Sequence, residues 1–304
     1  MKPVRPLATA LAEQVLLLDG GLSNQLQAQG CDLTDALWSA RLLADGPEQI
    51  EAAHAAYVRA GAQVLITSSY QATFEGFARR GTGPDEAARL LARSVELARA
   101  AGEGVDREVW VAASVGPYGA MLADGSEYRG RYGLSVDELA RFHRPRIEAL
   151  AGAGPDVLAL ETVPDTDEAE GLLKAVDGCG VPVWLSYTID GDRTRAGQPL
   201  ADAFRLLAGV GQVVAVGVNC CDPRDVGPAV ALAAEVTGKP VVVYPNSGEE
   251  WDAGARDWRG GATFAPDAMD RWRADGARLI GGCCRVGPDL IAGLATTLRE
   301  AGKG

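Results

Sequence analysis

The sequence predicts an α/β protein, and more narrowly a single (β/α)8 barrel of the TIM type. Three observations lead to this fold class. Short runs of apolar, largely β-branched residues recur eight times, helical stretches with start and stop signals lie between them, and the alternation fills most of the 304 residues. Alternating strands and helices indicate a parallel sheet, and eight such units in a chain of this length indicate closure into a barrel.

The predicted strands are apolar almost throughout, which is typical of strands that are buried on both faces. They cover residues 15–18, 63–69, 109–115, 157–163, 181–189, 213–219, 240–246 and 277–282.

The predicted helices are bounded by Pro, Gly and capping residues. One begins at Pro47 and ends at Gly61, and another begins at Ser135, which has the spacing of a capping box with Glu138. We expect Pro145 to kink that second helix. The full set covers residues 47–61, 84–102, 135–154, 166–178, 199–211, 227–238, 265–277 and 287–302.

We expect one domain over residues 1–304, with 1–14 as an N-terminal extension, because no linker or low-complexity segment interrupts the pattern. Two long loops, 116–135 and 245–266, follow the third and seventh strands. In a barrel they would lie on the C-terminal face, where active sites are built. The alternative fold is an open doubly wound sheet, and the lack of a G-x-G-x-x-G after the first strand weighs against it.

Composition narrows the class of protein. The net charge is −12, aromatic residues make up 6% of the chain, and there is no basic stripe, so we expect no nucleic-acid partner. No apolar run is long enough to span a membrane, and the first residues lack a signal-peptide pattern, so we expect a cytoplasmic protein. Six cysteines in such a chain should stay reduced, and two histidines leave little room for histidine-based chemistry. The oligomeric state is not predicted.

Four of the six cysteines follow predicted strands six and eight, as Asn219-Cys220-Cys221 and Gly281-Gly282-Cys283-Cys284. The carboxyl ends of these strands meet on one face of a barrel. Side chains alternate along a strand, so an extended Cys283-Cys284 pair could not serve one centre. We expect Gly281 and Gly282 to let the backbone turn both sulfurs the same way.

Cys220, Cys283 and Cys284 are therefore the candidate ligands of a zinc ion. Three thiolates leave one tetrahedral position open, which is typical of catalytic zinc rather than structural zinc. A simpler interpretation is that a cysteine is only a small buried hydrophobic side chain. We accept it for Cys31 and Cys179 and favour it for Cys221. A disulfide between the adjacent residues 283 and 284 is the strained alternative.

A substrate thiol is the natural occupant of the open position, where it would become a nucleophile toward an activated methyl group. Asp19-Gly20-Gly21, after the first strand, offers backbone N–H groups to a carboxylate. Glu161, at the C-terminal end of the fourth strand, could accept bonds from an ammonium group. Together they would hold an amino acid whose thiol reaches the metal. The alternative is a hydrolase, in which zinc-bound hydroxide attacks the substrate and Glu161 acts as the base. The sequence alone does not exclude it.

At these residues the sequence resembles the homocysteine S-methyltransferase family, through Asp19-Gly20-Gly21, Val218-Asn219-Cys220 and Gly281-Gly282-Cys283-Cys284-Arg285. The segments 30–43, 60–73, 114–133, 142–150, 241–249 and 276–285 resemble its bacterial, S-methylmethionine-using branch, and the likeness covers roughly residues 15–295.

This resemblance implies a (β/α)8 barrel with Zn²⁺ on Cys220, Cys283 and Cys284, and methyl transfer to L-homocysteine to give methionine. Asp19, Gly20, Gly21 and Glu161 match the positions that hold homocysteine. Asn219 matches the residue before the first zinc ligand, and we expect it to bind substrate as well. We expect the donor pocket to be lined by Tyr70, Gln71 and the Glu127-Tyr128 segment.

The resemblance favours S-methyl-L-methionine as methyl donor. S-adenosylmethionine as donor, and another thiol or a selenol as acceptor, are the alternatives within the same chemistry. The alternatives of another class are a zinc hydrolase and a zinc- or thiol-binding protein without turnover. Aromatic faces can hold a sulfonium, and the candidates are Tyr70, Tyr118, Tyr128, Trp251 and Trp258.

Overall fold

The computed structural model describes residues 2–33, 38–252 and 257–301. Its main sheet has eight parallel strands in the order β1-β12-β9-β8-β5-β4-β3-β2, and a bridge between Leu18 and Val64 joins the two ends into a barrel. The predicted (β/α)8 fold is therefore confirmed. The barrel strands are β1 (Leu16–Leu17), β2 (Val64–Ile66), β3 (Trp110–Val115), β4 (Val157–Val163), β5 (Val183–Tyr187), β8 (Val213–Asn219), β9 (Val241–Tyr244) and β12 (Ala277–Ile280).

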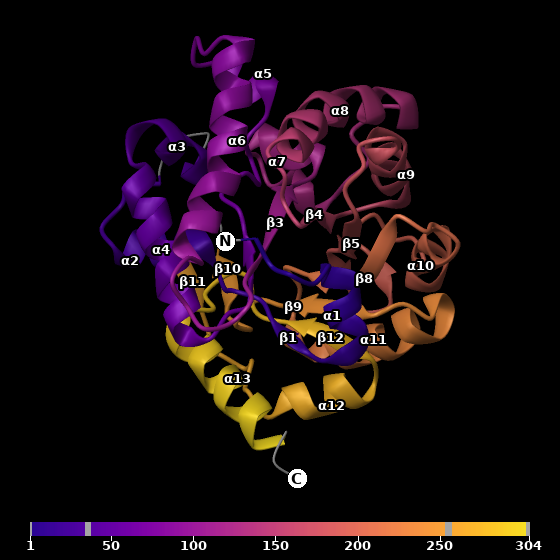
Figure 1. Ribbon diagram of the computed structural model, residues 1–304. Helices are drawn as coiled ribbons and strands as arrows, with labels where there is room; N and C mark the ends of the chain where they lie inside the picture. Colours follow the sequence, from indigo (N-terminus) through magenta and orange to yellow (C-terminus); the bar gives the residue numbers. More distant parts are fainter. Residues whose placement is uncertain (1, 34–37, 253–256, 302–304) are drawn as a thin grey trace.

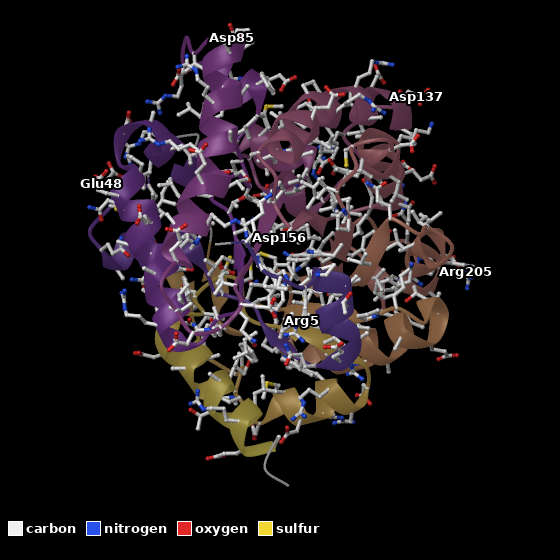
Figure 2. All side chains as sticks on the ribbon, in the orientation of Figure 1. Arg5, Glu48, Asp85, Asp137, Asp156 and Arg205 are labelled. Atoms are coloured by element: carbon white, nitrogen blue, oxygen red, sulfur yellow. The ribbon has the colours of Figure 1, made fainter. Side chains whose placement is uncertain are left out.

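Helices surround these strands (Figure 1). They include α2 (Leu22–Ala28), α4 (Pro47–Ala60), α6 (Pro84–Ala101), α8 (Val136–Gly152), α9 (Thr166–Val176), α10 (Leu200–Ala208), α11 (Pro223–Thr237), α12 (Ala268–Ala274) and α13 (Pro288–Ala301). Their outer faces carry charge, as Figure 2 shows for Glu48 on α4, Asp85 on α6 and Arg205 on α10. None of the helices that the structure describes is long and apolar enough to cross a membrane.

Helix boundaries follow local capping chemistry. The capping box at the start of α8 is present, with reciprocal bonds between Ser135 and Glu138. The predicted start of the sixth helix at Gly227 was wrong, because α11 begins at Pro223. Asp222 caps it by accepting a hydrogen bond from Arg224 N at 2.8 Å.

The N-terminal extension forms a helix that the sequence analysis did not predict, α1 (Leu7–Glu13). Its Leu7, Ala10 and Leu11 are buried in the cluster that also holds Trp110 and Trp184. Figure 1 shows α1, in indigo, across the central strands. The helix covers the N-terminal mouth of the barrel, which leaves the opposite end for chemistry.

Short elements interrupt the loops that follow the strands. The loop after β3 contains α7 (Tyr118–Leu122) and η2 (Ser126–Tyr128), and the loop after β9 contains the hairpin β10 (Glu250–Asp252) and β11 (Asp257–Arg259). The predicted single strand 181–189 was too long, because β5 ends at Tyr187 and a separate hairpin follows, β6 (Ile189–Asp190) and β7 (Arg193–Thr194). Three further short helices are η1 (Trp38–Arg41), α3 (Leu42–Asp45) and α5 (Phe74–Ala78).

Candidate metal centre and substrate site

Three sulfur atoms meet at the C-terminal end of the barrel. Cys283 Sγ lies 3.2 Å from Cys220 Sγ and 4.0 Å from Cys284 Sγ, and Cys220 Sγ lies 3.7 Å from Cys284 Sγ. All three are free thiols. Among the described residues, they form the one group of three His, Cys, Asp or Glu side chains close enough to hold a metal ion together.

The triangle has the size that a tetrahedral metal requires. Zinc–sulfur bonds of about 2.3 Å at tetrahedral angles place the sulfurs about 3.8 Å apart. The three observed separations bracket that value. Hydrogen bonds from Cys220 and Cys283 lower the pKa of the Cys284 thiol. The donor set therefore fits a soft divalent ion.

The remaining cysteines lie elsewhere. Cys221 is fully buried in the hydrophobic layer between sheet and helices, and burial raises the pKa of its thiol. Cys31 Sγ lies 3.9 Å from Gln49 Oε1, and Cys179 Sγ accepts a hydrogen bond from Gln212 at 3.3 Å. The preference for a packing role at Cys221 agrees with its position.

Backbone geometry turns the sulfurs toward each other. Cys220 takes a left-handed conformation, with φ of 51°, and its carbonyl accepts a bond from Thr188 Oγ1 at 3.1 Å. Cys283 N donates to Pro245 O at 2.7 Å, and Cys284 N to Asn246 Oδ1 at 3.2 Å. Each cysteine is thus fixed through its own main chain.

The two glycines before the cysteine pair act differently from the prediction. Neither has a positive φ, so neither supplies a left-handed turn. A Cβ on Gly281 would collide with Leu18 and with the carbonyl of Asp19, and one on Gly282 would collide with the side chain of Val286. They are glycines because the chain passes too close to its neighbours for a side chain.

Asp19 and Glu161 are both buried, 2% and 5% exposed. Asp19 Oδ2 accepts a bond from Ile66 N at 2.9 Å and lies 4.0 Å from His54 Nδ1, and burial lowers the pKa of His54 to about 4, so that ring is neutral. Burial raises the pKa of Asp19 above its ordinary value, and the Glu161 charge adds to this effect. Ser114 Oγ donates to Glu161.

Burial also raises the pKa of Glu161 to about 7, while the hydrogen bonds from Ser114 and Tyr244 oppose the shift. Among the described residues, neither Asp19 nor Glu161 forms an ion pair with a Lys or Arg side chain, so a bound ammonium group would stabilise both carboxyls.

The prediction that both Gly20 and Gly21 offer free N–H groups was wrong for Gly21. Its N–H donates to Val286 O at 2.9 Å, and its carbonyl accepts the Tyr57 hydroxyl at 3.0 Å. The amide of Gly20 donates to none of the groups that the structure describes. A Cβ on Gly20 would collide with Val286 O and the Tyr57 ring, so the turn packs tightly against the segment that follows the cysteine pair.

The side chain of Asn219, expected to bind substrate, is instead surrounded by hydrogen-bond partners from neighbouring strands. Its Oδ1 accepts from Thr162 N and Ser186 Oγ, both at 2.8 Å, and its Nδ2 donates to Thr162 Oγ1 at 2.8 Å. Thr162 has a φ of 59°. The fully buried amide therefore ties the ends of β4, β5 and β8 together. It fixes Cys220, which follows Asn219 in the chain, and, through Thr162, the preceding residue Glu161.

Of the expected donor-pocket residues, Tyr128 reaches the sulfur cluster from the loop after β3. Tyr128 Oη lies 3.2 Å from Cys220 Sγ, and the guanidinium of Arg195 lies 5.9 Å from the centre of the Tyr128 ring. Gln71 Nε2 donates to Ala120 O at 3.1 Å, and its Oε1 is buried without a partner among the described residues. The half-buried Tyr70 packs on Gly116, and burial, with a contribution from the charge of Cys220, raises the pKa of Tyr70.

For the other aromatic candidates, Tyr118, Trp251 and Trp258, the structure gives no contact with the sulfur cluster among the described residues. Tyr118 packs against Tyr132 and Phe142, with ring centres 5.2 and 4.8 Å away, and so belongs to a cluster beneath the loop. Trp251 and Trp258 are paired across the β10–β11 hairpin, and their side chains lie outside what the structure describes.

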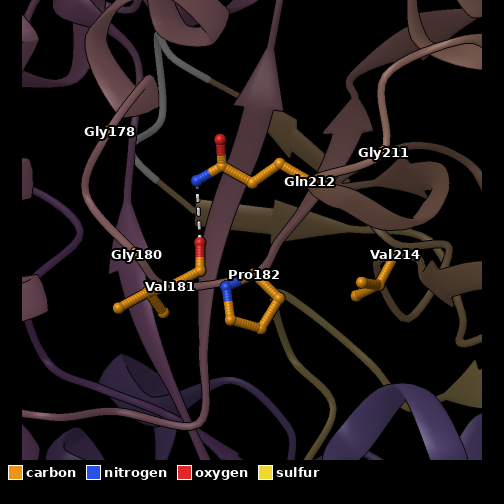
Figure 3. A pocket seen from close by; sticks show the side chains of 7 residues that line it. All are labelled: Gly178, Gly180, Val181, Pro182, Gly211, Gln212 and Val214. Atoms are coloured by element: carbon orange, nitrogen blue, oxygen red, sulfur yellow. Dashed lines mark hydrogen bonds between the residues drawn. The ribbon is translucent and has the colours of Figure 1, made fainter.

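A depression of about 400 Å³ lies at the other end of the barrel, where β5 and β8 begin. Figure 3 shows its lining, in which Gln212 donates to the carbonyl of Val181 at 2.8 Å. The lining contains Gly, Val and Pro residues and that glutamine, without a charged side chain. It offers no catalytic group, so the sulfur cluster is the stronger candidate.

Known proteins of one family resemble this chain along the whole barrel. The family model described as Homocysteine S-methyltransferase matches residues 16–298. The chain is 47% identical over 306 residues to the Homocysteine S-methyltransferase of Escherichia coli (strain K12), covering 97% of this chain and 99% of that protein. It is 42% identical to Homocysteine S-methyltransferase YbgG of Bacillus subtilis (strain 168), covering 94% and 95%.

A solved structure is similar as well. The metallated form of the Escherichia coli homocysteine methyltransferase MmuM matches with a TM-score of 0.87 and 45% identity, covering 96% of this chain and 100% of that chain.

Proposed function

The chain belongs to the homocysteine S-methyltransferase family, and from that premise we propose that it transfers a methyl group from S-methyl-L-methionine to the thiol of L-homocysteine. The products are two molecules of methionine, one from each substrate. The observation that carries the proposal is the triangle of Cys220, Cys283 and Cys284 sulfurs, beside two buried carboxyls. The whole chain, 1–304, acts as one domain in this proposal.

We assign Zn²⁺ to the three cysteines because the sulfur separations match its tetrahedral bond length and because thiolates select soft ions. When bound, zinc lowers the pKa of a coordinated thiol and so supplies a thiolate near neutral pH. Free thiols at this site suit a reducing compartment such as the cytoplasm.

The residues of the chain supply binding and orientation. Asp19 and Glu161 accept the α-ammonium group of homocysteine, which brings each carboxyl the cation that its buried position lacks. The amide of Gly20 is available to the carboxylate. With its amino-acid end fixed there, the thiol extends toward the sulfur triangle, and this orientation replaces a random encounter with a fixed approach.

Methyl transfer then needs no further acid or base. A lone pair of the homocysteine thiolate attacks the methyl carbon of the sulfonium. The new carbon–sulfur bond forms as the old one breaks, and its electron pair returns to the donor sulfur, which leaves as a neutral thioether. Opposite charges cancel in this step, so a site that excludes water favours it. The loop that carries Tyr128 lies against Cys220 and helps to exclude water.

The test is a methyl-transfer assay on zinc-loaded protein with homocysteine and a panel of donors that includes S-methylmethionine and S-adenosylmethionine. We expect methionine to form fastest with S-methylmethionine. Formation from S-adenosylmethionine alone would replace the proposed donor, a faster reaction with another thiol or a selenol would replace the acceptor, and hydrolysis without a thiol would replace the reaction class.

Cys220→Ala and Cys221→Ala form a matched pair, since the two residues are adjacent but only the first points into the triangle. The first variant should lose zinc and activity, and the second should keep both. Full activity of Cys220→Ala would refute the assignment.

A further inference from the structure

The Glu127 side chain lies half-buried at the site, and within the described part of the chain one of its two carboxylate oxygens lacks a partner. Its Oε2 atom is buried, and among the described residues it has no hydrogen-bond partner. Burial raises the pKa of Glu127 and the charge of Cys220 adds to the rise, while a hydrogen bond from the residue's own backbone opposes it. A buried carboxylate oxygen without a partner is costly, and a cation bound there would offset that cost.

The position of Glu127 is set by its loop. Tyr128, the next residue, places its hydroxyl 3.2 Å from Cys220 Sγ. A Cβ on Gly119 would collide with the Glu127 main chain, so α7 forms a close-fitting seat for this residue. Nearby, Asp165 Oδ2 accepts from Arg131 N at 2.7 Å, which anchors the far end of the loop.

The other end of the loop is also fixed. Glu168 Oε1 accepts from Tyr118 N at 2.6 Å and lies 2.9 Å from His143 Nε2, and both side chains are fully buried. Glu127 is thus held beside the sulfurs by a loop that is anchored on α8 and α9, and its carboxylate is oriented before any substrate arrives.

The charge of the surroundings indicates what binds. Three thiolates, a divalent ion and a substrate thiolate together carry net negative charge, and Glu127 adds to it. The ring of Tyr128, whose hydroxyl lies against Cys220 Sγ, already has the Arg195 guanidinium near its face. A donor that carries positive charge would relieve this repulsion, while a neutral or anionic donor would be rejected.

We propose that the Glu127 carboxylate binds the α-ammonium group of the methyl donor and so selects an amino-acid sulfonium. The ammonium is a better partner than the sulfonium because the sulfonium loses its charge during transfer. A carboxylate on the sulfonium would stabilise the ground state more than the transition state and slow the reaction. A carboxylate on the ammonium stabilises both states and leaves the reacting methyl free. This inference rests on the proposed function.

The experiment compares Glu127→Gln with wild type on two donors. One is S-methylmethionine, and the other is 4-(dimethylsulfonio)butanoate, which is the same molecule without its amino group. The lost charged hydrogen bond should lower kcat/KM for S-methylmethionine by about 10- to 100-fold. For the des-amino donor we expect a change of less than about threefold, because the missing group leaves nothing for Glu127 to bind. The KM for homocysteine should stay the same.

Asp124→Asn is the matched control, with the same loss of charge in the same loop. Asp124 is exposed, and its Oδ1 accepts from Ser126 N at 3.0 Å, a bond that Asn can keep. It should behave as wild type with both donors, and the zinc content of all three proteins should agree.

Equal losses of Glu127→Gln on both donors, or no loss on either, would overturn the inference. Those outcomes differ from a failure of the proposed function, in which wild-type protein itself would transfer no methyl group to homocysteine.

Discussion

Asn219→Ala tests whether the buried amide positions the site or touches the substrate. In the structure it makes three hydrogen bonds of 2.8 Å, two to Thr162 and one to Ser186. Truncation leaves the Thr162 amide, the Thr162 hydroxyl and the Ser186 hydroxyl without this partner. An unpaired buried group costs about 1–3 kcal/mol.

The Ser186 hydroxyl can keep its bond to Tyr244 Oη at 2.8 Å, so its share of the loss is small. We therefore expect the free energy of unfolding to fall by about 3–5 kcal/mol in total. Because Asn219 also fixes Cys220, zinc affinity should fall by about 10- to 100-fold, as for other residues that support metal ligands.

The assay is urea denaturation of the metal-free protein together with a zinc competition titration. Ser186→Ala serves as control, since it removes one of the three Asn219 bonds together with the bond to Tyr244 and should cost about 1–2 kcal/mol. If Asn219→Ala unfolds within about 1 kcal/mol of wild type, keeps its zinc affinity and changes only the KM for homocysteine, the positioning role is refuted and a direct substrate contact is favoured.

Two further predictions concern the carboxyl and the glycine beside the metal centre. The folded pKa of Glu161, about 7, lies above its ordinary value of 4.5, so this carboxyl stabilises the native state fully below about pH 4.5 and loses that contribution as the pH rises through 7. Glu161→Gln should remove about 3 kcal/mol of the pH dependence of unfolding between pH 4.5 and 8. Urea denaturation at both pH values measures it, and an unchanged slope would contradict the assignment. Gly282→Ala should weaken zinc binding at least about tenfold because its Cβ has no room beside Val286, whereas Gly287→Ala, with open space around it, should bind zinc normally. Equal affinities of the two alanine variants in a zinc titration would show that the close approach is unimportant.

The barrel and its sulfur cluster could be predicted from sequence because both depend on periodicity and topology. Apolar runs separated by helices fix the order of the strands, and in a closed barrel that order places Cys220 near Cys283 and Cys284. Asp19 follows β1 and Glu161 lies near the end of β4, so the same rule places both at that end of the barrel, where both are buried.

What could not be predicted depends on contacts between segments distant in sequence. The hydrogen bonds of Asn219 to Thr162 join two strands, and the Gly21 amide is taken by Val286 from the other end of the chain. The left-handed conformation of Cys220 has no signal in the sequence. The α1 helix does have a signal in the sequence, because Leu7, Ala10 and Leu11 have helical spacing. Nothing in the sequence indicated that this helix would cover the barrel.

The central claim is that three sulfurs hold a zinc ion with one position left for a substrate thiol. Zinc K-edge X-ray absorption on the zinc-loaded protein tests it most directly. We predict three sulfur neighbours at about 2.3 Å without substrate and four after homocysteine is added. Four protein ligands before addition, or a sulfur count that homocysteine leaves unchanged, would contradict the account.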